Sequence, residues 1–127
     1  MAQEPQELVF SLNKRYQLLE NDNPVTVDVI VGEKEQSPNL TVKLNSKTLL
    51  KNFTGSIKNL PVDINSALDG KVLKISGTVL DTAPDSNKID VTLKVKGGDE
   101  ELSRKFSVTL EDDGEIVDVA FVIRFKL

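Results

Sequence analysis

The fold is decided by the last twelve residues of the chain, IVDVAFVIRFKL, which run from Ile116 to Leu127. Read at a period of two, one face of this stretch is apolar without a break: Val117, Val119, Phe121, Ile123, Phe125 and Leu127. The other face is polar towards both ends and apolar at Ala120 and Val122. β-Branched and aromatic residues dominate and no Gly or Pro interrupts, which favours a strand over a helix. We therefore expect a strand in the interior of a sheet, with the rest of the chain covering it.

Alternation of apolar and polar residues, with turn signals between the runs, predicts further strands along the chain. The expected strands are residues 7–12, 25–31, 39–44, 48–57, 71–80, 88–96, 102–110 and 116–127. Residues 13–20 fit either a strand or a single helical turn, and residues 65–68 fit one helical turn. Gly55 predicts a bulge or a close approach of another backbone, and Gly77 predicts a second bulge.

Short strands separated by turns in this way predict an all-β protein, an antiparallel two-sheet β-sandwich of about 7–9 strands. The pattern favours an immunoglobulin-like arrangement over a jelly-roll or a C2-like one, although the Cys…Trp…Cys hallmark of antibody domains is absent. Since the chain has 127 residues, we expect a single β-sandwich domain over residues 7–127, preceded by a frayed N-terminus at residues 1–6.

The composition argues against several classes of protein. A hydrophobic content of 39% with 28% charged residues is typical of a soluble globular protein. The net charge is -4, and no basic run is longer than Lys14-Arg15 or Arg104-Lys105, so no nucleic-acid partner is expected. No apolar run approaches the ~20 residues of a membrane helix, so no membrane partner is expected either. No signal-peptide pattern opens the chain, which makes a cytoplasmic location the default expectation.

Catalysis and cofactor binding find little support in the residue types. The chain has no His and no Cys, which removes the commonest general base, the thiolate nucleophile and the commonest ligands of transition metals. One Tyr and no Trp leave few rings to line the sugar-binding cleft that a glycosidase with paired carboxylates needs. No Gly-rich phosphate loop follows a strand and opens a helix. We therefore expect a protein that is not an enzyme, with no catalytic residue and no cofactor.

One candidate metal site follows from the expected strand order. If the last four strands run alternately up and down, the loop at 81–87 and the turn at 111–115 lie at the same end of the sandwich. That end would gather Asp81, Asp85, Glu111, Asp112, Asp113 and Glu115. Calcium takes about six to eight oxygen ligands from flexible loops, which makes Asp81, Asp85, Asp112, Asp113 and Glu115 candidate ligands. Acidic turns that stay solvated are the commoner explanation, and the chain has no EF-hand spacing.

Three hypotheses about function remain. The leading one is a non-catalytic β-sandwich module that acts by protein–protein contact, as a structural, adhesive or assembly component. A sheet edge would bind a protein partner or a second copy of the chain, since strand addition needs only backbone hydrogen bonds. The first alternative is a calcium-dependent binding domain that uses the acidic loops. The second alternative is an enzyme of unidentified chemistry.

Overall fold

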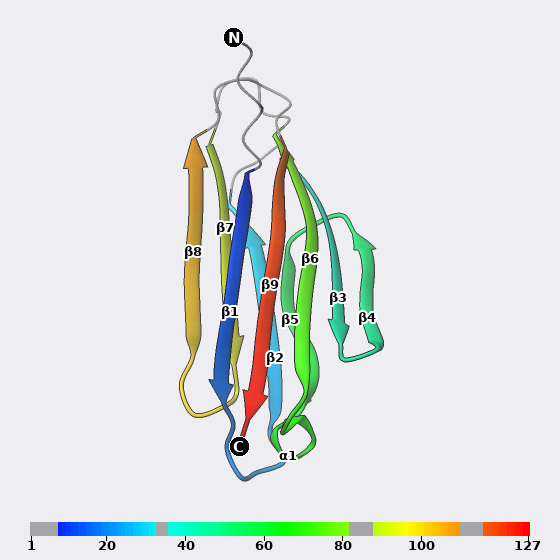
Figure 1. Cartoon of the computed structure of the whole chain (residues 1–127), viewed down its shortest axis with the longest axis vertical. Coiled ribbons are helices and arrows are strands. Elements are labelled where there is room, and N and C mark those ends of the chain that lie inside the picture. Colours follow the sequence, from blue (N-terminus) through cyan, green and yellow to red (C-terminus); the bar gives the residue numbers. More distant parts are fainter. Residues whose placement is uncertain (1–7, 33–35, 82–87, 110–115) are drawn as a thin grey trace.

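A computed structural model of the chain describes residues 8–32, 36–81, 88–109 and 116–127. These residues form nine β-strands and one short helix (Figure 1). The elements in chain order are β1 (Val9–Gln17), β2 (Pro24–Val31), β3 (Gln36–Leu44), β4 (Lys47–Phe53), β5 (Ile57–Ile64), α1 (Asn65–Leu68), β6 (Val72–Asp81), β7 (Lys88–Lys96), β8 (Leu102–Thr109) and β9 (Ile116–Lys126). The all-β prediction and the helical turn at residues 65–68 are both confirmed.

The strands form two sheets. The five-stranded sheet has the order β1-β9-β6-β3-β4, and the four-stranded sheet has the order β5-β2-β7-β8. β9 lies between β1 and β6, in the interior of the sheet, as the sequence predicts. β1 pairs with β9 in parallel, whereas the other strand pairs of the described residues are antiparallel. The expectation of a purely antiparallel sandwich is therefore wrong at the edge where β1 and β9 run side by side.

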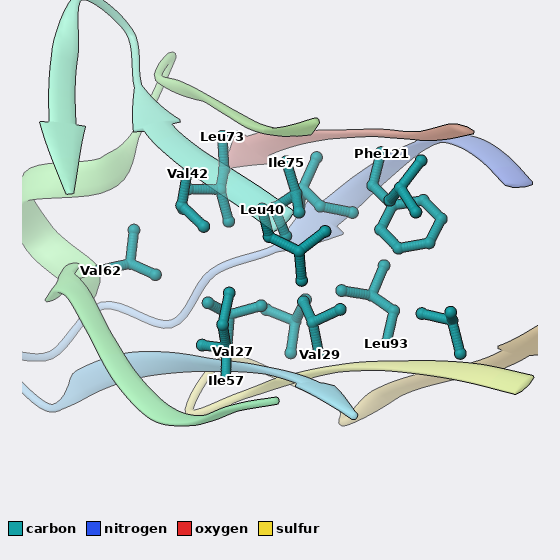
Figure 2. Packing of buried hydrophobic residues seen from close by; sticks show 14 of the residues in the cluster. Val27, Val29, Leu40, Val42, Ile57, Val62, Leu73, Ile75, Leu93 and Phe121 are labelled. Atoms are coloured by element: carbon teal, nitrogen blue, oxygen red, sulfur yellow. The ribbon is translucent and has the colours of Figure 1, made fainter. Parts of the chain in front are cut away.

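The hydrophobic core lies between the two sheets and is filled from both (Figure 2). Leu40, Ile75 and Phe121 of the five-stranded sheet point towards Val29 and Leu93 of the four-stranded sheet. All five side chains are completely buried. Burial alternates along most strands, because successive side chains of a strand point to opposite faces. The period of two in the sequence is therefore the signal that separates core from surface.

The segment at residues 48–57 corrects one expectation. It holds parts of two strands, because β4 ends at Phe53 in the five-stranded sheet and β5 begins at Ile57 in the four-stranded sheet. Gly55 lies in the connection between them and forms no bulge. The strand at the N-terminus is also longer than expected, since β1 continues to Gln17.

Gly77 corrects a second expectation. β6 keeps an unbroken register with both of its neighbours at this residue, so no bulge is present. A Cβ atom built at Gly77 would lie 1.9 Å from the Asn39 carbonyl oxygen, and its φ of 149° is one that L side chains rarely adopt. The glycine therefore permits a close approach of the β3 backbone.

Candidate functional site

The acidic end that the sequence predicts lies almost entirely outside the described residues. β6 is antiparallel to β9 and β7 to β8, so the strand ends that flank residues 82–87 and 110–115 lie at one end of the molecule (Figure 1). Asp81 closes β6, whereas Asp85, Glu111, Asp112, Asp113 and Glu115 fall outside the described residues. In the described ranges, no group of three or more His, Cys, Asp or Glu side chains could hold a metal ion. Calcium binding at this end stays a prediction.

β8 forms an edge of the four-stranded sheet, with β7 on one side and no described strand on the other. Its register with β7 is unbroken from Lys88↔Thr109 to Val95↔Leu102. The other edge of this sheet is less regular, because β5 contains Pro61 and has register shifts against β2. β4, at an edge of the other sheet, is shifted against β3 as well. Bulges, Pro and charged side chains protect a sheet edge from further pairing. β8 has no bulge and no Pro, and its charges are those of Arg104 and Lys105.

The backbone groups that β8 turns outward can be assigned from one hydrogen bond. Gly32 N donates to Asp90 O over 2.9 Å, so the N–H and C=O of Asp90 face β2. These groups alternate sides along an antiparallel strand, so the residue after Asp90, Val91, faces β8, where it pairs with Phe106. Every second residue of β8 therefore turns its N–H and C=O away from β7: Ser103, Lys105, Ser107 and Thr109.

Apolar and basic side chains surround this edge. Leu102, Phe106 and Val108 of β8 pack against the core but are only partly buried. The ring of Phe106 lies 5.6 Å from that of Phe10 on β1, which brings the edges of β8 and β1 to the same side of the molecule. Arg104 shares the inward face with Leu102 and Phe106 but is exposed. This side of the molecule therefore combines half-covered apolar surface with positive charge.

Asp28 is the one carboxylate that is buried among the described residues. It accepts a hydrogen bond from Asn59 N, and its Oδ2 lies 3.0 Å from Lys96 Nζ. Asn59 has a φ of 51° and lies in β5, where the register shifts against β2. Burial raises the pKa of Asp28, but the hydrogen bond from Asn59 and the charge of Lys96 outweigh it, so the pKa lies below its ordinary value. Asp28 therefore anchors an irregular part of β5 and shows no sign of acid–base function.

We expect Asp28→Asn to lower the free energy of unfolding at pH 7 by about 1.5–3 kcal/mol, the usual worth of a hydrogen bond to a charged group. A carboxylate whose pKa is lowered by folding stabilises the folded state. This stabilisation is complete above the unfolded pKa of about 3.9 and is lost as the pH falls through the folded pKa. Urea unfolding between pH 7 and pH 3 should therefore show the gap between wild type and variant closing below about pH 4. An Asp99→Asn control should show no gap, because Asp99 is exposed.

Asn65 holds the opposite end of the molecule together. This side chain is completely buried and uses its amide fully: Nδ2 donates to Asn23 O and Gly97 O, and Oδ1 accepts from Leu19 N, over 2.9–3.0 Å. The three partners lie in the connection between β1 and β2 and in the turn after β7. Asn65 is thus a structural residue, and its satisfied hydrogen bonds leave it nothing to offer a ligand.

A row of basic side chains crosses the outer face of the five-stranded sheet, with one residue from each strand: Arg15, Arg124, Lys74, Lys43 and Lys51. Arg15 pairs directly with Arg124, and Lys74 pairs directly with Lys43. We call these five residues the basic row. A search for runs of Lys and Arg in the sequence misses the row, because its members are far apart in the chain.

Comparisons with protein-family models, with curated proteins and with solved structures found no match to this chain. No helix of the described residues is both long enough and apolar enough to span a membrane. The surface features that remain as candidates are the β8 edge and the basic row.

Proposed function

We propose that the protein is a non-catalytic binding module that acts by protein–protein contact, as a structural, adhesive or assembly component, and that its contact site is the β8 edge. The observation that carries the proposal is the regular edge of β8, with four outward-facing backbone positions beside partly buried apolar side chains. Strand addition at such an edge gains affinity from backbone hydrogen bonds, and alternate side chains supply specificity. An added strand would also cover Leu102, Phe106 and Val108.

The charge of this edge favours a foreign partner over a second copy of the chain. Arg104 and Lys105 lie in the middle of β8, and both are exposed. Antiparallel pairing of β8 with β8 of a second copy about their centres would set these cations against each other. Like charges opposite one another destabilise a strand pair, whereas opposite charges stabilise it. The partner is therefore an extended segment that alternates apolar with acidic residues.

The proposal includes an immunoglobulin-like topology. In immunoglobulin domains strand B pairs with strand E in one sheet, and strands C, F and G are consecutive in the other. The pairing of β2 with β5 and the order β3-β6-β9 support this correspondence. β4 then corresponds to the additional strand beside C in variable-type domains. The chain departs from that pattern through β7 and β8, which form a hairpin between the strands that correspond to F and G.

Lys105→Pro tests the proposal because the Lys105 N–H points away from β7. Pro removes that donor and places its ring at the edge without breaking a bond to β7. The probe is a short synthetic peptide that alternates valine with glutamate, and binding is measured by fluorescence anisotropy. Wild type and Lys105→Ala should bind it, Lys105→Pro should lose binding, and all three should melt at similar temperatures.

Arg104→Pro is the matched control for the fold. Arg104 pairs with Leu93 of β7 and turns its N–H towards β7, so removing this N–H should lower the melting temperature of the protein. Equal binding of the peptide by Lys105→Pro and Lys105→Ala would place the contact elsewhere and overturn the proposal. No binding by the wild-type protein would overturn it as well.

A further inference from the structure

The basic row sets like charges against one another without ion pairs to described carboxylates. Arg15 and Arg124 face one another across parallel strands, and Lys74 and Lys43 face one another across antiparallel strands. Directly opposed like charges destabilise a sheet. No carboxylate of the described residues forms an ion pair with any of the five side chains of the row. This unbalanced positive charge belongs to a protein with a net charge of -4.

Two hollows lie along the row. The larger, of about 750 Å³, contains Lys43, Lys51 and Lys74 together with the hydroxyl groups of Thr41, Thr48 and Ser76. The smaller, of about 300 Å³, contains Arg15 and Arg124 beside Val72. Arg124 Nε donates to Asn13 Oδ1 over 2.9 Å, which fixes this guanidinium on the outer face. The row is thus an oblique line of cations, with hydroxyl groups beside its three lysines.

We propose that the basic row binds a linear acidic polysaccharide, independently of the β8 edge. Neighbouring strands lie about 4.8 Å apart, so the row spans about 19 Å across the five strands. It runs obliquely, because Arg124 is opposite Val72 and Lys43 is opposite Thr48. That length suits a chain of charges better than a single anion. The Lys and Arg side chains supply the charge contacts, and the Thr and Ser hydroxyls beside the lysines can bind the hydroxyl groups of a sugar.

Other polyanions fit this face less well. Single-stranded nucleic acid is held by aromatic rings on which bases stack, and no aromatic side chain lies in the larger hollow. Stable attachment to an anionic membrane needs buried apolar side chains or a lipid chain besides the basic residues, whereas the lysines here surround a depression that no described apolar side chain lines. A carboxylate-rich peptide pairs best with the forked guanidinium of Arg, whereas three of the five cations of the row are Lys.

The test uses a short heparin fragment as the probe, titrated by isothermal calorimetry at near-physiological salt. Wild type should bind, with an affinity that falls as salt is added. Lys43→Gln combined with Lys74→Gln should weaken binding about tenfold or more, because each cation beside an anionic surface contributes separately. The double variant should melt no lower than wild type, since it removes an opposed pair of like charges.

Lys58→Gln combined with Lys94→Gln is the matched control, because it makes the same change of net charge on the four-stranded sheet. This control should leave heparin binding nearly unchanged. Equal losses of heparin affinity in the two double variants would show that net charge alone attracts heparin. That result would overturn the assignment of the binding site to the basic row. Binding of duplex DNA or polyglutamate as tightly as heparin would overturn the choice of ligand, and absence of heparin binding would overturn both.

Discussion

Phe121→Ala should cost about 3–5 kcal/mol of the free energy of unfolding, the usual range for truncation of a buried aromatic side chain. Phe121 is completely buried in the middle of β9, between β1 and β6. Its ring stacks on that of Phe106, with centroids 5.0 Å apart. The truncation would leave a cavity where the two sheets meet (Figure 2). Chemical denaturation measures the loss.

Phe53→Ala is the matched control, because Phe53 is 40% exposed at the end of β4. This substitution should cost less than about 1 kcal/mol, since its site can refill with water. A denaturation midpoint of Phe121→Ala that matches the midpoint of Phe53→Ala would show that β9 is not the centre of the core.

Asn65→Asp should be nearly as destabilising at pH 7, by about 3 kcal/mol or more, because a buried group that loses its partners costs about 1–3 kcal/mol for each. The substitution replaces the Nδ2 donor by an oxygen that faces the carbonyl oxygens of Asn23 and Gly97. The Leu19 N–H would be the one donor left to this buried carboxylate, so its pKa would be raised, and its cost grows as the pH rises from the unfolded value of about 3.9 towards the raised pKa. Stability should therefore recover in part when the pH is lowered.

Asn23→Asp provides the same change of amide to acid at an exposed position. Its effect should stay within about 0.5 kcal/mol, because Asn65 bonds only to the backbone of Asn23 and the Asn23 side chain is exposed. Thermal melts of both variants at pH 7 and pH 5 make the comparison. If Asn65→Asp and Asn23→Asp melt at the same temperature as each other at pH 7 and again at pH 5, Asn65 does not hold this end of the molecule together.

Most of the strands could be predicted because burial follows a period of two. Val25, Val27 and Val29 are all buried on β2, and Ile89, Val91, Leu93 and Val95 are all buried on β7. β1 was harder to delimit beyond Leu12, because the next position on its inward face is Lys14, which lies at a sheet edge and is exposed. The order of the strands in each sheet depends on contacts between distant parts of the chain, and no local pattern contains them. The same holds for the parallel pairing of β1 with β9.

The candidate sites differ in how far the sequence could predict them. The sequence predicts a sheet edge as the binding surface, but the strand that forms this edge depends on the order of the strands in the sheet. The basic row was not expected, because Lys43 and Lys74 become neighbours only when β3 pairs with β6. Asp28 and Asn65 give no signal in the sequence, because folding alone brings their partners near: backbone groups for both, and also the Lys96 side chain for Asp28.

Amide hydrogen exchange, resolved by residue along β8, tests the open edge most directly. In the protein alone, slow exchange should alternate with fast exchange, because only every second N–H is bonded to β7. The slow amides should be Arg104, Phe106 and Val108, and the fast ones Ser103, Lys105 and Ser107. The valine–glutamate peptide should slow exchange at the fast positions and leave the other strands unchanged. Slow exchange along the whole of β8 before the peptide is added, or fast amides that the bound peptide leaves unprotected, would contradict strand addition at this edge.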